Sequence, residues 1–286
     1  MSTALPSRCG VVGGGRMGSG IAHALLVAGS EVTLVESGAD TAEAARQRVT
    51  DAVRESEARA LLSEAVETVL SRLRVVEQFE ALAASGLVIE AVPEDLALKI
   101  DVVRAIEAVV SADAVIATNT SSLPVSDIAS ASERPERVIG LHFFNPVPAS
   151  VLVEIVVADQ MASGLVDVAR GWVVALGKTP IVVRDSPGFA SSRLGVVLGL
   201  EAIRMLEEGV ASADDIDTAM ALGYRHPVGP LRLTDIVGLD VRLDIARHLE
   251  LTLGPRFAPP ALLIDKVKRG ELGRKSGQGF YSWHAS

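Results

Sequence analysis

Four polar side chains in the middle of the chain have the chemistry needed to move a proton. Ser121 lies in the run 119–122, His142 and Asn145 follow one another closely, and Glu154 comes twelve residues after His142. Each ends or closely follows a short apolar run, which is where an α/β sheet presents its functional side chains. An imidazole exchanges protons near neutral pH, and a carboxylate from an adjacent strand would fix its tautomer and raise its basicity. The pattern predicts His142 as acid–base group with Glu154 as its partner.

A glycine-rich turn near the N-terminus predicts a dinucleotide site. The segment Val11-Val12-Gly13-Gly14-Gly15-Arg16-Met17-Gly18 fits G-x-G-x-x-G between an apolar strand and a helical pattern. In such turns the first glycine permits the tight bend, the second lets a diphosphate approach, and the third packs helix against strand. Gly13, Gly15, Met17 and Gly18 are therefore the candidate residues, with the diphosphate at the helix N-terminus.

Glu36 predicts which dinucleotide is bound. It ends the second apolar run, 18 residues after Gly18. A carboxylate there accepts hydrogen bonds from the adenosine ribose and repels the 2′-phosphate of NADP, and neither Ser37 nor Gly38 supplies a compensating positive charge. We expect NAD, which would accept a hydride while His142 takes the hydroxyl proton.

The blocks Asn119–Ser122, His142–Pro146 and Leu152–Glu154 together resemble the L-3-hydroxyacyl-CoA dehydrogenase family, in order and in spacing. The tail blocks Gly223–Leu231 and Gly273–Tyr281 are similar to the C-terminal domain of that family, so the resemblance covers nearly the whole chain. It implies reversible NAD-dependent oxidation of an (S)-3-hydroxyacyl-CoA to the 3-ketoacyl-CoA in fatty acid β-oxidation. The substrate would be short, such as 3-hydroxybutyryl-CoA, with 3-hydroxyadipyl-CoA as a close variant.

The resemblance also implies roles for further residues, each with a structural alternative. Ser121 would bind the 3-oxygen of the substrate or the nicotinamide amide; alternatively it caps the helix that begins near Pro124. Glu94 and Lys99 would lie near the nicotinamide half of the cofactor, unless they only mark a strand end and a capped helix start. Asn145 would bind the cofactor or structure the Asn-Pro turn.

One position departs from the family pattern. After Pro187-Gly188-Phe189 the family usually carries an Asn that contacts the substrate carbonyl, just before the residue that corresponds to Arg193. Here that position is Ser192. A hydroxyl can still donate a hydrogen bond, but it is shorter and lacks the two-sided geometry of an amide. We expect Ser192 to keep a weaker substrate contact, directly or through water.

Two other functions remain open at this point. A related dehydrogenase of a free hydroxy acid, of the gulonate or carnitine type, would share the Rossmann turn and the His–Glu pair; a requirement for CoA would separate it. A non-catalytic NAD-binding protein would not need Ser121, His142 and Glu154 together.

The elements that must position these residues follow from hydrophobic periodicity. Short β-branched runs alternate with helical patterns, which predicts a Rossmann-type, mostly parallel sheet of the α/β class. The expected strands are 9–12, 32–35, 87–92, 114–117, 138–141, 152–157 and 181–183, with 73–76 as a weaker candidate. Between the second and third lies Ala42–Leu73, predicted to be a helical hairpin with an apolar stripe over Leu61–Leu70. The resemblance implies that this insertion holds the CoA part of the substrate.

After Asp185-Ser186-Pro187-Gly188 the pattern becomes all helical. We expect helices over 189–208, 213–221, 231–251 and 260–270, which predicts an NAD-binding Rossmann domain over 1–186 and a helical domain over 187–286. The second domain would contribute to the substrate site and to a homodimer, because apolar faces such as Leu194–Leu206 and Ile236–Leu249 are too extensive for it to bury alone.

The composition narrows the class of partner. A net charge of −9 argues against nucleic acid and anionic membranes, so the phosphates of an acyl-CoA must meet local donors. Arg46, Arg48, Arg54 and Arg59 are candidates, or else they form a solvated helical face. No metal site is expected, and the single cysteine, Cys9, is predicted to be a core residue. The sequence shows neither a signal peptide nor a membrane span, so we expect a cytoplasmic protein.

Overall fold

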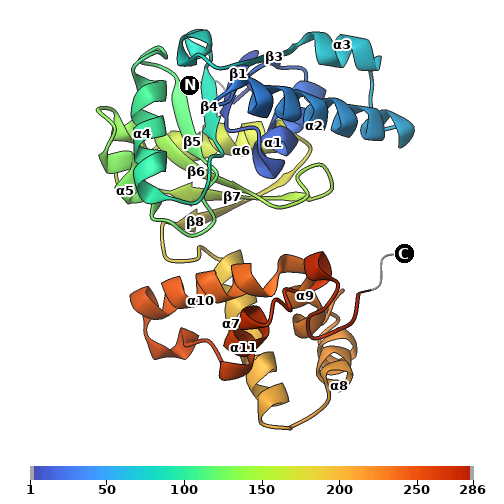
Figure 1. Cartoon of the computed structure of the whole chain (residues 1–286). Coiled ribbons are helices and arrows are strands. Elements are labelled where there is room, and N and C mark those ends of the chain that lie inside the picture. The colour runs from blue at the N-terminus through green and yellow to red at the C-terminus, as the bar shows by residue number, and fades with distance from the viewer. Residues whose placement is uncertain (1–2, 284–286) are drawn as a thin grey trace. The chain divides into compact units, whose positions relative to one another are not determined.

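The computed structural model describes residues 3–283, and the chain divides into two compact units, Met1–Ser186 and Pro187–Ser286 (Figure 1). Each unit has its own buried core. No helix among the described residues is both long enough and apolar enough to cross a membrane.

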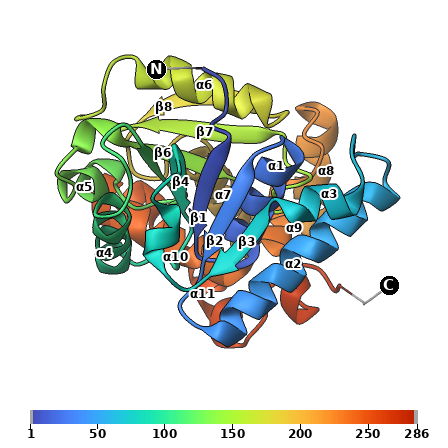
Figure 2. The same cartoon turned by 90° about the horizontal axis from the view of Figure 1, so that it is seen from above.

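The first unit is built on one eight-stranded sheet, in the spatial order β3-β2-β1-β4-β5-β6-β7-β8 (Figure 2). The first six strands run parallel, β7 is antiparallel to β6, and β8 is parallel to β7. This confirms the predicted mostly parallel Rossmann-type sheet. The strands are β1 (Arg8–Val12), β2 (Glu31–Val35), β3 (Leu73–Val76), β4 (Leu87–Glu90), β5 (Val115–Thr118), β6 (Val138–Phe143), β7 (Leu152–Val157) and β8 (Thr179–Arg184).

Helices connect and cover these strands. Three of them, α1 (Arg16–Val27), α2 (Ala39–Ala58) and α6 (Leu165–Ala175), share one hydrophobic cluster with the sheet. The helix α4 (Leu96–Glu107) packs on β4 and β5, and α5 (Val125–Ser130) packs on β6. The parallel strands bury β-branched side chains, which explains why their short apolar runs predict strands from the sequence.

The predicted stripe over Leu61–Leu70 is wrong in its first half. The helix α2 ends at Ala58, Ala60 has a left-handed φ of 55°, and only Val66–Ser71 forms the second helix, α3. Leu61 is 63% exposed, whereas Val66 and Val69 are buried. The apolar spacing continued through a segment whose backbone had already left the helical region, so periodicity alone overran the helix boundary.

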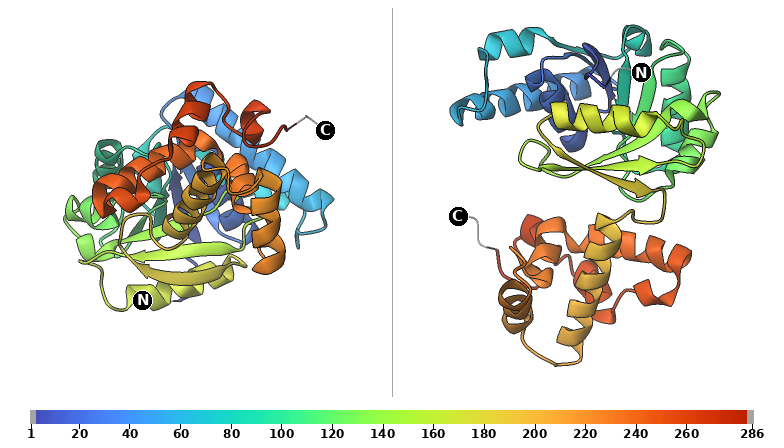
Figure 3. Two further views of the ribbon diagram at one scale, coloured as in Figure 1. Left: turned by 90° about the horizontal axis from the view of Figure 1, so that it is seen from below. Right: turned by 180° about the vertical axis from the view of Figure 1, so that it is seen from behind.

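Among its described residues the second unit contains helices and, near its end, isolated β-bridges but no strand, as expected, and its helices are the yellow-orange to red ribbons of Figure 3. The longer ones are α7 (Ser191–Glu207), α8 (Ala213–Thr218) followed by a π-helical turn (Ala219–Gly223), α9 (Pro230–Val237), α10 (Leu239–Leu253) and α11 (Ala261–Lys268), and short 3-10 helices lie at Pro255–Phe257 and Arg274–Ser276. The prediction of a single helix over 231–251 is wrong, because the structure has two helices there. Gly238, with a φ of 107°, separates α9 from α10, a conformation that favours glycine.

The tail folds back onto α9 through one buried carboxylate. Asp235 is fully buried and accepts hydrogen bonds from the backbone of Phe280 and Tyr281 and from Nε1 of Trp283. A Cβ added at Gly279 would lie 2.3 Å from the Asp235 carboxylate. The glycine in the tail block is therefore required by close packing.

Candidate active site

The glycine-rich turn between β1 and α1 has the close backbone packing that its sequence predicts. Gly13 has a φ of 91° and donates to the carbonyl of Val35 at 2.9 Å. A Cβ at Gly18 would lie 1.7 Å from the Gly13 carbonyl oxygen, whereas one at Gly15 would meet nothing within 4 Å. The turn therefore has no free space at Gly18, where helix and strand are in contact, but its backbone is accessible at Gly15. Open backbone beside an uncapped helix N-terminus fits a dinucleotide diphosphate.

Two charged side chains hold this turn. One oxygen of Glu36 accepts from the Gly14 amide at 2.5 Å, and the other accepts from Ser37 at 3.1 Å. Nη1 of Arg48, on α2, donates to the Gly14 carbonyl at 2.8 Å. The sequence located Glu36 at the strand end but did not predict that Arg48 reaches this turn, because periodicity carries no signal for a contact 34 residues away.

The neighbouring arginines behave differently. Arg46 forms an ion pair with Glu43, and Arg59 forms one with Glu55, both on exposed faces of the same helix. These contacts match the solvated helical face that was one of the two predictions for them.

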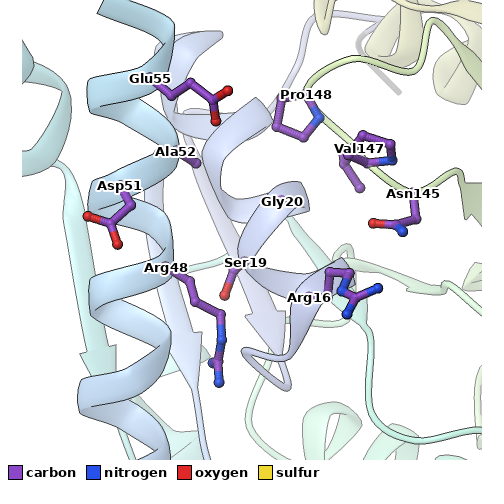
Figure 4. A pocket seen from close by; sticks show the side chains of 11 residues that line it. Arg16, Ser19, Gly20, Arg48, Asp51, Ala52, Glu55, Asn145, Val147 and Pro148 are labelled. Atoms are coloured by element: carbon purple, nitrogen blue, oxygen red, sulfur yellow. The ribbon is translucent and has the colours of Figure 1, made fainter. Parts of the chain in front are cut away.

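A pocket of about 370 Å³ lies next to the glycine-rich turn (Figure 4). It is lined by α1, α2 and the loop after β6, and Figure 4 shows Arg16 close to Asn145 while α2 forms the opposite wall. Asn145 therefore shares a cavity with the start of α1, where the cofactor turn lies. Arg16 and Arg48 bring positive charge to this cavity, and Asp51 and Glu55 bring negative charge.

Glu94 organises the loop that carries Ser121. Its Oε1 accepts hydrogen bonds from Thr120 Oγ1 at 2.7 Å, from the Ser121 amide at 2.9 Å and from the Ser121 hydroxyl at 3.2 Å. The amide and hydroxyl of Ser122 donate to the same oxygen. Burial alone would raise the pKa of the Glu94 carboxyl, but Lys99 and these hydrogen bonds outweigh it and hold the pKa below its usual value. The ionised carboxylate thereby joins the loop after β4 to the loop after β5.

The helix-cap alternatives resolve in opposite ways. Helix α5 has Pro124 at its N-cap and no side-chain cap, so the structure does not support the alternative in which Ser121 caps this helix. Asp95 does cap α4, since its carboxylate accepts from the Leu98 amide at 2.9 Å.

Lys99 is buried in an ion pair beneath this loop. Its Nζ lies 2.8 Å from Glu90 and 3.4 Å from Glu94, and both Lys99 and Glu90 are almost completely buried. Thr118 Oγ1 donates to the second Glu90 oxygen at 2.6 Å. Sequence reasoning missed Glu90 and Thr118, although a carboxylate ending an apolar strand nine residues before a lysine was an available signal.

His142 and Glu154 lie opposite each other on the antiparallel strands β6 and β7. The Nδ1 of His142 is 2.8 Å from Glu154 Oε2; His142 is 6% exposed and Glu154 is fully buried. The ring of Phe144 lies 4.4 Å from the imidazole, and the Asn119 side chain accepts from the Phe143 amide at 2.9 Å. The strand register and the Asn119 contact thus hold the imidazole at the end of β6. A carboxylate at Nδ1 selects the tautomer whose lone pair is on Nε2.

The remaining predicted residue, Ser192, lies in the first turn of α7 and so belongs to the second unit. Met17 lies in the first turn of α1, partly buried against the core of the first unit.

Two family descriptions match the sequence. Residues 8–186 match "3-hydroxyacyl-CoA dehydrogenase, NAD binding domain", and residues 188–283 match "3-hydroxyacyl-CoA dehydrogenase, C-terminal domain". The chain is 42% identical over 289 residues to a 3-hydroxybutyryl-CoA dehydrogenase of Mycobacterium tuberculosis, covering 99% of this chain and 100% of the relative. It is 36% identical to the mitochondrial hydroxyacyl-coenzyme A dehydrogenase of Rattus norvegicus, covering 96% of this chain and 90% of the relative.

Solved structures show the same likeness. The crystal structure of M. tuberculosis FadB2 has a TM-score of 0.93 at 40% identity, and that of (S)-3-hydroxybutyryl-CoA dehydrogenase PaaH1 from Ralstonia eutropha has a TM-score of 0.93 at 35% identity. Each match covers 98% of this chain and 100% of the other.

Proposed function

The chain belongs to the 3-hydroxyacyl-CoA dehydrogenase family, and from that premise we propose which of its groups carry the reaction and on which substrate they act. It is an NAD-dependent oxidoreductase that interconverts a 3-hydroxyacyl-CoA and the 3-ketoacyl-CoA. The observation that carries the proposal is the buried His142–Glu154 pair at 2.8 Å, which couples an acid–base group to a fixed carboxylate.

When bound, NAD⁺ accepts the hydride that leaves C3 of the substrate. Nε2 of His142 takes the proton of the 3-hydroxyl group, so that the C3–O bond becomes a carbonyl. Glu154 accepts a hydrogen bond from the Nδ1–H group throughout and stabilises the positive charge that the imidazole acquires. In the reverse direction His142 returns the proton to the 3-oxygen. The turn residues Gly13, Gly15, Met17 and Gly18, together with Glu36, would hold the cofactor.

Ser121 orients the reacting centre in this proposal. Its hydroxyl would bind the 3-oxygen or the nicotinamide amide, on a loop that Glu94 holds through hydrogen bonds to Thr120, Ser121 and Ser122. Lys99 would act through Glu94, because its ammonium group pairs with both Glu90 and Glu94. Asn145 would contact the cofactor from the pocket it shares with Arg16. Ser192 would donate a weaker hydrogen bond to the substrate carbonyl.

The substrate is a short-chain (S)-3-hydroxyacyl-CoA in this proposal, in the manner of 3-hydroxybutyryl-CoA. Support comes from the full-length similarity to relatives that carry the name 3-hydroxybutyryl-CoA dehydrogenase. A role in fatty acid β-oxidation follows from this substrate class, and a cytoplasmic location is a separate part of the proposal.

A homodimer is a further part of the proposal. Large apolar side chains remain exposed on the helices of the second unit: Leu194, Leu198, Leu233, Ile236, Val237 and Val241. Several recur three or four residues apart on α7 and α9, as expected for faces that a second copy covers. Light scattering after gel filtration would measure the mass; a monomer at micromolar concentration would contradict this part.

The reaction is tested by following NADH absorbance with acetoacetyl-CoA and with free acetoacetate. We expect turnover with the thioester alone, and its loss in His142→Ala. His226→Ala is the matched control, since that imidazole lies in the second unit and has no place in the proposed chemistry. Turnover with free acetoacetate would point to a dehydrogenase of free hydroxy acids. Retained turnover in His142→Ala would refute the acid–base assignment.

A further inference from the structure

Lys178 immediately precedes β8, and its ammonium group binds the loop that joins β6 to β7. Its Nζ donates hydrogen bonds to the backbone carbonyls of Val147 and Ser150, both at 2.6 Å. The next backbone amide, that of Thr179, donates to the Val151 carbonyl at 2.6 Å. The start of β8 therefore holds three carbonyls of a loop that belongs to the candidate active site.

The loop contains a single helical turn, which explains why a cation binds it. The Pro146 carbonyl accepts hydrogen bonds from the amides of Ala149 and Ser150, at 3.1 and 3.0 Å. A helical segment leaves its last carbonyls without partners inside the helix, and lysine side chains can satisfy them. Lys178 does this for Val147 and Ser150. Removal of its ammonium group would deprive both carbonyls of a charged donor.

The same turn also packs against α1. Val147 is 2% exposed, and a Cβ added at Gly20 of α1 would lie 2.8 Å from the Cβ of Val147. Burial and, to a smaller extent, the positive charge of Lys178 lower the pKa of His23, also on α1, to about 4. The imidazole of His23 is therefore neutral at pH 7 and does not repel the ammonium group. Contacts with the start of β8 and with α1 together fix the turn.

The fixed turn forms part of the pocket beside the glycine-rich turn. Asn145 immediately precedes it, and Figure 4 shows Asn145, Val147 and Pro148 along one side of this pocket. Lys178 does not itself line the pocket. Any effect of Lys178 on a ligand there must therefore pass through the loop that it holds.

We propose that Lys178 is a positioning residue of the cofactor site, which fixes the turn after Asn145 and so holds the Asn145 amide where it contacts NAD. This inference rests on the proposed function, in which Asn145 contacts the cofactor. The pair of His142 and Glu154 does not depend on Lys178, because the ladder of β6 and β7 places the two residues opposite each other. Lys178 therefore governs cofactor affinity, and the proton transfer in the fully bound complex is independent of it.

The test is a double-mutant cycle on NADH affinity, measured by fluorescence titration. In Lys178→Met the turn loses two hydrogen bonds, and we expect the Kd for NADH to rise roughly fivefold or more. Asn145→Ala should raise the Kd by a similar factor. Lys178→Met/Asn145→Ala should raise it no further than the larger of the two single changes, because both act through one contact.

A second measurement separates positioning from a general loosening of the hairpin. At saturating NADH, kcat for acetoacetyl-CoA reduction by Lys178→Met should stay within about twofold of the wild-type value, since the His142–Glu154 pair is intact. Arg184→Met is the matched control: this cation ends β8, its side chain is 88% exposed, and its ion-pair partner is Asp159 rather than the loop. Its NADH affinity should equal that of the wild type.

Three results would overturn the inference: wild-type NADH affinity in Lys178→Met, a further fivefold rise in Kd when this change is added to Asn145→Ala, or a fall in kcat as large as the rise in Kd. Should Lys178→Met not fold, Lys178→Gln replaces it, because its neutral amide is one bond shorter and should weaken NADH binding in the same direction. Turnover of acetoacetyl-CoA by the wild type tests the proposed function separately, since the cycle on NADH affinity needs no turnover.

Discussion

At the residue scale, the acid–base group depends on its carboxylate partner. In Glu154→Gln the side chain keeps its size, but an amide no longer balances a charged imidazole and can donate to Nδ1, which favours the wrong tautomer. We expect kcat for acetoacetyl-CoA reduction to fall by roughly 100-fold or more, with a smaller change in KM. Steady-state kinetics measure this, with thermal denaturation to verify that the variant is folded. An unaltered kcat in a folded variant would remove Glu154 from the mechanism.

The buried Lys99–Glu90 pair makes a second prediction at this scale. Lys99→Met leaves Glu90 charged and unpaired in the interior, which should lower the free energy of unfolding by about 3–5 kcal/mol. The double variant Lys99→Met/Glu90→Gln should recover part of that loss, since no lone charge remains. Urea denaturation measures both.

Lys268→Met is the control for charge removal as such, because its pair with Asp265 is exposed and should be worth less than about 1 kcal/mol. A loss of similar size in Lys268→Met and Lys99→Met would contradict the interpretation of a buried, costly pair.

At the element scale, the junction of β1 and α1 tolerates no side chain at its third glycine. In Gly18→Ala the new Cβ would lie 1.7 Å from the Gly13 carbonyl oxygen, so the turn itself must shift. We expect the dissociation constant for NADH, measured by fluorescence titration, to rise roughly tenfold or more.

Gly164→Ala is the matched control, because a Cβ there meets nothing within 4 Å and the backbone φ is −85°. Its NADH affinity should equal that of the wild type. Wild-type affinity in Gly18→Ala would show that the turn does not hold the cofactor.

Most strands and helices could be predicted from the sequence, but the direction of one strand and the end of one helix could not. The buried strands of the sheet could be predicted because each is a short β-branched run with a clear beginning and end in the sequence. The direction of β7 was not predicted, although the loop 144–151 is too short for the crossover that a parallel neighbour needs. The break at Gly238 was missed because the apolar spacing continues smoothly from α9 into α10.

Some residues of the candidate site could be predicted from the sequence, and others could not. Ser121, His142 and Glu154 were found because a known chemistry requires those groups in that order. Glu90, Thr118 and the Arg48–Gly14 contact were missed, because each depends on which strand ends adjoin in space. The catalytic and binding roles themselves stay predictions until the variants are measured.

At the scale of the whole molecule, two units with separate cores divide the chemistry. The first contains the glycine-rich turn, the His–Glu pair and the loop of Ser121, whereas Ser192 belongs to the second. In the proposed enzyme, then, the groups that carry the reaction lie in the first unit, and the second contributes the substrate contact of Ser192.

The antiparallel step from β6 to β7 also bears on how the chain reaches its native state. His142 and Glu154 are joined by one hairpin and lie only twelve residues apart, whereas the Arg48–Gly14 contact at the cofactor turn spans 34 residues. Short-range contacts incur less loop-closure entropy and tend to form earlier in folding. The proton-transferring pair is therefore expected to form at a smaller loop-closure cost than the contact that holds the cofactor turn.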